Sequence, residues 1–185
     1  MISMDMEIHI DQLIDGELRL EFEEKPESFP VLAQMIQKGE FDFSAPVKTR
    51  LRVFRIGDFI EVEGAFETAT HLVCGRCLKE FETRLSSDIA LTYTPENFEN
   101  NEDLSRDEIE LSPEEAGLIP FSGDRIDLRE GVQEQVVMAI PVRPLCDAKC
   151  KGLCPQCGAD LNLGGCGCDR PPRNAQFSAL KNLKL

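Results

Sequence analysis

Apolar and polar residues alternate over a long central part of the chain, which is the pattern of β-strands with one buried face. The alternation covers residues 47–53 and, after a turn at Gly57-Asp58, residues 60–66. It resumes on the odd-numbered positions between Phe81 and Tyr93. Consecutive segments of this kind predict an antiparallel meander that packs one face on the core and leaves the other in solvent.

Two shorter strands and a helix are expected before this meander. Residues 6–10 and 17–22 have the composition and, in the second case, the alternation of short strands. Residues 28–39 instead carry apolar side chains at helical spacing. Pro30 suits the first turn of that helix and Gly39 can end it.

The clearest helix is predicted over residues 127–140, where apolar residues recur at every fourth position. Asp127 can cap its first turn, and Glu130 stands where a capping box places the reciprocal acid. Pro141 ends the pattern. Residues 174–185 have the apolar spacing of a further short helix, which we expect to dock on the body.

The charge of the chain is strongly negative and unevenly distributed. Its 34 acidic and 20 basic residues give a formal charge of −14. Residues 141–185 hold seven Lys or Arg and three Asp, a charge of +4, so residues 1–140 carry −18. Nine acidic residues and one arginine lie within residues 95–115, which indicates a solvated loop or a contact for a basic partner. The negative charge of residues 1–140 opposes non-specific binding to nucleic acid.

Candidate chemistry is concentrated in the cysteines, six of which lie between Cys146 and Cys168. The run contains Cys154-Pro-Gln-Cys157-Gly158 and, eight residues later, Cys166-Gly-Cys168. A Cys-x2-Cys turn presents two thiolates on one side of a tight loop, and Gly158 permits the positive φ that such a turn needs. A second close pair completes the four sulfur ligands of a structural zinc ion. We therefore expect zinc as the cofactor.

The remaining sulfur atoms allow two ways of dividing the eight cysteines. In the first, Cys154, Cys157, Cys166 and Cys168 form one site, and the hairpin pair Cys74 and Cys77 joins Cys146 and Cys150 in a second. The alternative places Cys146, Cys150, Cys154 and Cys157 together and leaves the hairpin pair as free thiols. The spacing favours the first division, in which metal binding contributes to the folding free energy.

The N-terminal sequence and the cysteine content together indicate a compartment. Residues 1–11 lack a basic region followed by an apolar one, so no secretory signal is predicted. Apolar runs are too short for a membrane span, and no membrane contact is expected. We expect a cytoplasmic protein, in which paired Cys-x2-Cys motifs indicate metal or redox chemistry rather than disulfides.

Catalysis finds little support in the sequence, and no catalytic or cofactor-binding residue is predicted besides the metal ligands. A catalytic zinc keeps an open position and often uses His or a carboxylate. The histidines, His9 and His71, lie outside the Cys-rich run. A thioredoxin-type site at Cys74-Gly-Arg-Cys77 would sit between a strand and a helix. Here both flanks are predicted strands.

These features predict an α+β fold: an antiparallel β-sheet or partly closed barrel with a packing helix and a C-terminal Cys-rich zinc-knuckle segment. Residues 1–140 would form an acidic, β-rich domain that contains the helix at 127–140. Residues 141–185 would form a metal-binding tail that ends in a short helix. This division follows the change in charge and in cysteine content.

The motifs of the chain resemble those of the YceD-like family, the large ribosomal RNA subunit accumulation proteins of bacteria and plastids. The resemblance covers most of the chain and is carried by these motifs: Cys74-Gly-Arg-Cys77, Ile140-Pro-Val142, Cys150-Lys-Gly-Leu-Cys154-Pro-Gln-Cys157-Gly158, Asp160-Leu-Asn162 and Cys166-Gly-Cys168. Residues 169–173, Asp-Arg-Pro-Pro-Arg, depart from the Asp-Pro-Arg that such proteins often have before the last helix. The resemblance implies a role in the accumulation, processing or stability of large-subunit ribosomal RNA, and supplies no catalytic residue.

The hypothesis that follows is a non-enzymatic, zinc-binding ribosome-biogenesis factor. Two alternatives stay open, a zinc-ribbon module for a protein partner outside ribosome assembly and a thiol redox protein. Affinity for RNA comes largely from neutralised phosphates, which a body of charge −18 cannot supply. We therefore expect a basic ribosomal protein or assembly factor of the large subunit as the partner, and ribosomal RNA contacted through the basic tail is the alternative.

Overall fold

A computed structural model of the chain describes residues 6–13, 16–96 and 117–168. The chain divides into two compact units, which are described separately. The first contains the residues up to Leu72 and Phe81–Val142. The second contains Val73–Glu80 and the residues from Arg143 onward.

The described residues form eight strands and two α-helices, with 3-10 turns at Ile10–Leu13 and Pro26–Ser28. The strands are β1 (Glu7–His9), β2 (Leu18–Glu24), β3 (Asp42–Phe43), β4 (Val47–Ile56), β5 (Phe59–Val73), β6 (Glu80–Pro95), β7 (Ile119–Phe121) and β8 (Arg125–Asp127). The helices are α1 (Pro30–Gln37) and α2 (Arg129–Met138).

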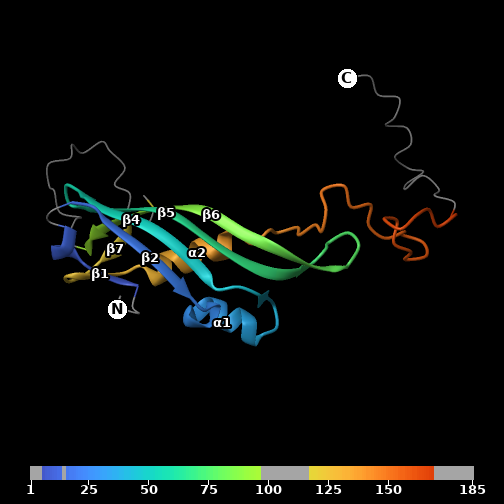
Figure 1. Cartoon of the computed structure of the whole chain (residues 1–185), viewed down its shortest axis with the longest axis horizontal. Helices are drawn as coiled ribbons and strands as arrows, with labels where there is room; N and C mark the ends of the chain where they lie inside the picture. Colours follow the sequence, from blue (N-terminus) through green and yellow to red (C-terminus); the bar gives the residue numbers. More distant parts are fainter. Residues whose placement is uncertain (1–5, 14–15, 97–116, 169–185) are drawn as a thin grey trace, which may run out of the picture. The chain divides into compact units, whose positions relative to one another are not determined.

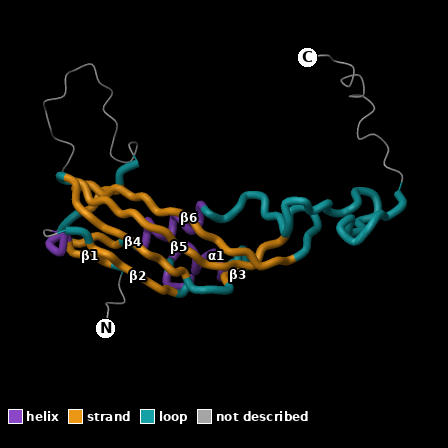
Figure 2. The backbone as a smooth tube through the Cα atoms, turned by 45° about the horizontal axis from the view of Figure 1, so that its top comes forward, coloured by secondary structure: helices purple, strands orange, loops and turns teal. Residues whose placement is uncertain are grey.

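The main sheet has the strand order β2-β4-β5-β6-β7, and β3 pairs with β5. Figure 2 shows β4, β5 and β6 as long neighbouring strands. The predicted alternation is reproduced in them, because Val53, Val62 and Phe66 are buried while the charged residues between them face solvent. On that solvent face the Arg52 guanidinium forms an ion pair with Glu63, its partner across β4 and β5.

Of the two expected architectures, an antiparallel sheet or a partly closed barrel, the structure has the sheet, which is open and differs from the expectation in containing one parallel pair. Its ends are β2 and β7, which do not pair with each other. Strand β7 runs parallel to β6, with Tyr93 opposite Ile119. A parallel pair needs a long connection, and residues 96–118 lie between the two strands. Strands β1 and β8 pair separately.

Helix α2 packs against the sheet through its apolar stripe and lies behind the long strands in Figure 1. Leu128, Val132 and Val136 are fully buried. The helix approaches β6 closely at Gly131, because a Cβ atom there would lie 2.5 Å from Leu91 Cδ1. The first unit is therefore a sheet with its core on the side of this helix.

Side-chain hydrogen bonds to backbone N–H groups mark the first turns of the two helices. The sequence predicted a helix from Asp127, but that residue belongs to β8, and its carboxylate accepts a hydrogen bond of 2.8 Å from the Arg129 N–H. Helix α1 begins at Pro30, which was predicted to lie in its first turn, and its Val31 N–H donates to Gln133 Oε1 at 2.6 Å. A side chain of α2 thus satisfies one free donor of α1.

Two predicted segments lie outside the described residues, namely the acidic stretch beyond Glu96 and the helix at 174–185. In the part of the chain that is described, neither helix has the length and apolar character needed to cross a bilayer.

Gly64 provides a test of the sheet. A Cβ atom at this position would lie 2.0 Å from the Arg50 carbonyl oxygen and 2.9 Å from Leu51 Cα, both in the backbone of β4. Because backbone atoms cannot move aside as a side chain can, we expect Gly64→Ala to lower the free energy of unfolding by about 1–3 kcal/mol. Urea denaturation followed by circular dichroism measures this change. Ser86→Ala, on the exposed side of β6, is the control and should change it little.

Candidate metal centres

The eight cysteines lie in two groups of four, and both groups belong to the second unit. The first group is Cys74, Cys77, Cys146 and Cys150, and the second is Cys154, Cys157, Cys166 and Cys168. Within each group the Sγ atoms all lie within 4.8 Å of one another. All eight thiols are free of disulfides. The structure therefore groups the cysteines in the first of the two ways allowed by their spacing.

The first group is assembled from two distant parts of the sequence. Cys74 and Cys77 lie in the turn between β5 and β6, and Cys146 and Cys150 lie in the segment that follows α2. Cys74 Sγ is 3.8 Å from Cys150 Sγ, and Cys77 Sγ is 3.6 Å from Cys146 Sγ. Three of these thiols are buried and Cys146 is half-buried.

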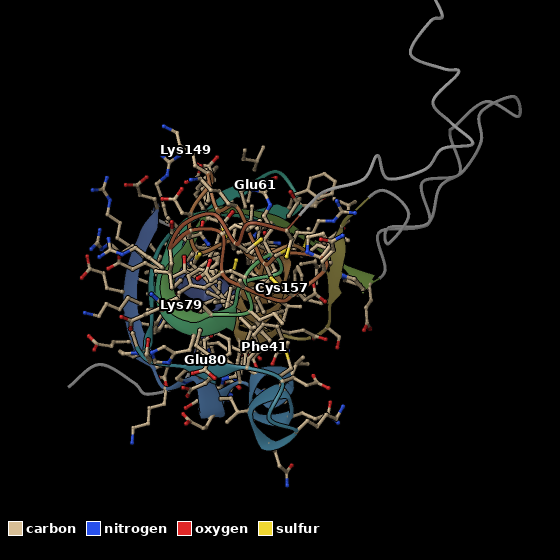
Figure 3. All side chains as sticks on the ribbon, turned by 90° about the vertical axis from the view of Figure 1, so that its right-hand side faces the viewer. Phe41, Glu61, Lys79, Glu80, Lys149 and Cys157 are labelled. Carbon is tan, nitrogen blue, oxygen red and sulfur yellow. The ribbon has the colours of Figure 1, made fainter. Side chains whose placement is uncertain are left out.

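The second group is local in sequence and much more open to solvent. Only Cys154 is buried, with 2% of its surface exposed. Cys166 and Cys168 are half-buried and Cys157 is exposed. Figure 3 labels Cys157 beside the sulfur atoms of the Cys-rich segment. Each group thus offers four cysteine ligands, but the ligands of the second group are more exposed to water.

The same hydrogen-bonded turn begins both groups. The N–H of Leu78 donates to the Cys74 carbonyl oxygen at 2.9 Å, and the N–H of Gly158 donates to that of Cys154 at the same distance. The N–H of Cys154 in turn donates to the Ala159 carbonyl oxygen, and the N–H of Cys74 donates to the equivalent Lys79 carbonyl oxygen. The residue after the second cysteine has positive φ in each turn, 72° for Gly158 and 59° for Leu78. Leucine at such a position carries backbone strain.

Hydrogen bonds between Arg76 and the segment after Cys146 hold the first group together. The Arg76 guanidinium donates to the Cys150 carbonyl oxygen at 2.8 Å, and the Arg76 carbonyl oxygen accepts from Leu153 N–H at 3.1 Å. Gly152 has φ of 74°, and a Cβ atom there would lie 2.9 Å from the Arg76 carbonyl oxygen. The Cys-Lys-Gly-Leu-Cys spacing therefore needs glycine at its centre, since the segment passes directly over the hairpin turn.

Asn162 links the segment of the second group to a ligand of the first. Its side-chain N–H donates to Cys150 Sγ at 3.4 Å, and its Oδ1 accepts from Lys151 N–H at 2.7 Å. Asp160 Oδ1 accepts from both the backbone and side-chain N–H of Asn162. The Asp160-Leu-Asn162 motif had no role predicted from the sequence. The tendency of Asp and Asn to form local turns was the available signal.

The electrostatics of each group favour one thiolate and oppose four. Hydrogen bonds from the backbone N–H groups of Cys146 and Cys77 lower the pKa of the Cys74 thiol to about 6. The backbone N–H of Cys157 contributes most to lowering the pKa of Cys154 to about 6. In contrast, the hydrogen bond with Cys77 raises the pKa of Cys146 to about 12. Complete ionisation of a group therefore requires a cation among the sulfur atoms.

The geometry fits a tetrahedral metal ion. Metal–sulfur bonds of about 2.3 Å, as in zinc sites, place the sulfur atoms about 3.8 Å apart. In the first group the Cys74–Cys150 and Cys77–Cys146 sulfur atoms, 3.8 and 3.6 Å apart, agree with this separation. A disulfide would instead require about 2.05 Å. Each group can hold one metal ion with four sulfur ligands.

His71, three residues before Cys74 in the sequence, belongs to neither group. His71 Nδ1 lies 2.9 Å from Asp42 Oδ2, its partner across β3 and β5. The flanks of Cys74 and Cys77 are the strands β5 and β6, as predicted. The hairpin pair therefore lacks the strand-to-helix setting of a thioredoxin site.

Comparison with known proteins associates the chain with one family. A family profile described as large ribosomal RNA subunit accumulation protein YceD matches residues 62–184, which is more than half of the chain and includes all eight cysteines. No solved structure matches.

Individual relatives are more distant. The chain is 25% identical over 162 residues to large ribosomal RNA subunit accumulation protein YCED homolog 1, chloroplastic, of Arabidopsis thaliana, covering 78% of this chain and 50% of that protein. It is 25% identical over 157 residues to the Zea mays protein of the same name, covering 75% and 53%. An uncharacterised Mycobacterium tuberculosis protein is 28% identical over 120 residues, covering 65% and 54%. The chain spans about half the length of these relatives.

The strain at Leu78 and its absence at Gly158 give a prediction about metal retention. In protein loaded with Zn(II), Gly158→Ala should weaken the second centre by about 1 kcal/mol, roughly fivefold in the dissociation constant, because alanine resists positive φ. Leu78→Gly should strengthen the first centre by a smaller factor, since the backbone entropy of glycine offsets part of the relief. Competition with a chromophoric chelator measures both.

Gly165→Ala is the matched control for this prediction. A Cβ atom at Gly165 meets no heavy atom within 4 Å, so this substitution should leave the chelator competition unchanged. Equal zinc retention by Gly158→Ala and Gly165→Ala would contradict the role assigned to the turn.

Proposed function

The chain belongs to the YceD family of large ribosomal RNA subunit accumulation proteins, and we propose that it acts as a non-enzymatic, zinc-binding ribosome-biogenesis factor in the cytoplasm. It would support the accumulation, processing or stability of large-subunit ribosomal RNA. The observation that carries this proposal is the coincidence of the two four-cysteine groups with the region matched by the family profile.

Zinc is the proposed occupant of both groups, with all eight cysteines as ligands. Four thiolates are the ligand set of structural zinc sites, which have no open position for a substrate. Zinc bound in this way supplies folding free energy, because the sites do not exist in the unfolded chain. In the first group the ion would join the β5–β6 turn to the segment at Cys146 and Cys150. A scaffold of this kind presents a binding surface and performs no chemistry on RNA.

The proposed direct partner is a basic protein of the nascent large subunit. Residues 1–140 carry a formal charge of −18, and residues 141–185 carry +4. A zinc ion with four thiolates adds −2 at each centre, which removes the positive charge of the tail. Binding of phosphates would thus gain little from counterion release. An acidic body instead complements a basic protein and accelerates its association.

Zinc content is the first test of this proposal. The reduced protein, purified without chelators, should contain about two zinc ions per chain, in line with four thiolates per ion. Cys74→Ala and Cys154→Ala should each lose one ion, and the double variant both. Elemental analysis of the native and variant proteins measures this. A chain that holds none would refute zinc binding, and loss of both ions in either single variant would refute two independent centres.

The second test separates a protein partner from direct RNA binding. Copurification from cells with a tagged chain should recover a basic large-subunit protein even after the RNA is digested. Changing the acidic residues between Glu96 and Glu115 to Asn or Gln should weaken that interaction and flatten its salt dependence, because their charges complement the partner. Zinc content should not change.

The matched variant for this test removes the positive charge of the tail. Changing Arg170, Arg173, Lys181 and Lys184 to Ala should leave the protein interaction intact. Tight binding of the purified chain to bare ribosomal RNA, with a steep salt dependence that this variant abolishes, would contradict the proposed partner and place RNA in its stead.

A further inference from the structure

The two cysteine groups have the same ligand type but differ in their exposure to solvent. In a loaded four-cysteine centre every ligand is a thiolate. Oxidation of cysteine depends on thiolate character and on exposure. Because thiolate character is then equal among the ligands, exposure decides which sulfur reacts first. Among the eight thiols, Cys157 alone is exposed.

The first group is protected by the contacts that assemble it. Cys74 and Cys150 have 0% and 5% of their surface exposed. Asn162 donates a hydrogen bond to the Cys150 sulfur, and the Arg76 guanidinium donates one to the Cys150 carbonyl oxygen. Its most accessible ligand, Cys146, is only half-buried. An oxidant in solution therefore meets the second group before the first.

We propose that Cys157 is a site of oxidative modification, at which a hydroperoxide opens the second centre and releases its metal while the first centre stays closed. This inference rests on the zinc binding proposed above. It adds a property that the accumulation role does not contain, namely an oxidant-sensitive centre beside an insensitive one.

The reaction uses the peroxide as its only oxidant. The Cys157 thiolate attacks one oxygen of hydrogen peroxide, so that an S–O bond forms, the O–O bond breaks and hydroxide leaves; with an organic hydroperoxide the leaving group is the alkoxide. A second thiolate then attacks the sulfenic sulfur, and an S–S bond replaces the S–O bond as another hydroxide leaves. The second thiolate is available, because the other three sulfur atoms of the group lie within 4.8 Å. In total, two thiolates are oxidised to one disulfide, one peroxide is reduced, and zinc loses two of its four ligands.

Peroxide treatment of the zinc-loaded full chain tests this inference. Zinc release is followed with a chromophoric chelator, and disulfides are mapped by mass spectrometry of the digested protein. About one of the two zinc ions should leave in a fast phase, because exposure controls the reaction. A disulfide containing Cys157 should form within the second group at the same rate. Release of both ions at one rate, or a first disulfide within the first group, would overturn the inference.

Two matched variants isolate the role of exposure. Cys157→His keeps a zinc ligand but removes the exposed thiolate, and should slow the fast phase about tenfold or more. Cys146→His makes the same change at the most accessible ligand of the first group and should leave the fast phase unchanged. An unchanged fast phase in Cys157→His would overturn the inference.

Zinc content before the oxidant is added distinguishes failure of the proposed zinc binding from failure of the inference about Cys157. A chain without zinc would refute the proposed zinc binding and this inference together. A chain with two zinc ions whose Cys157 is spared by peroxide would refute this inference alone. Disulfide mapping of the unsubstituted protein decides the question even where a variant fails to bind metal.

Discussion

Repulsion among closely spaced thiolates is the constraint on which the second unit depends. Four Sγ atoms within 4.8 Å of one another cannot all lose their protons unless a cation lies between them. Hydrogen bonds with Cys77 and with Cys157 raise the pKa values of Cys146 and Cys168, respectively, to about 12, whereas backbone N–H groups lower those of Cys74 and Cys154 to about 6. Folding of this unit and metal binding are thus one equilibrium in the proposal made here.

The sheet contributes to this arrangement through its longest hairpin. Strands β5 and β6 are neighbours in the sheet, and the turn between them carries two of the cysteines. Regular alternation along both strands fixes which side chains enter the core, and a shift by one residue would reverse it. The position of Cys74 and Cys77 in the turn follows from that register. A close backbone approach at Gly64 and helix α2 on the core side stabilise the same strands.

The two cysteine groups place one local motif in different surroundings. Both use the same hydrogen-bonded turn, yet one places Leu78 and the other Gly158 at the position of positive φ. The first group joins distant segments and has three buried thiols, whereas the second closes within a short stretch and has one buried thiol. Long-range assembly and burial suit a scaffold, and exposure suits exchange and modification. The difference lies in surroundings rather than in ligand identity.

The sequence by itself determined the elements and the candidate ligands. Alternation with period two predicted β4, β5 and β6, helical spacing predicted α1 and α2, and cysteine spacing indicated two groups of four. These signals are local, so they survive without knowledge of the partner segments. Tertiary structure decided the rest. It placed β7 parallel to β6, left the sheet open, began α2 after Asp127 and turned Asn162 toward Cys150. The parallel pair, the open sheet and the place of Asp127 in β8 depend on pairing between segments that are far apart in the sequence, and the contact of Asn162 with Cys150 depends on the fold of the Cys-rich segment.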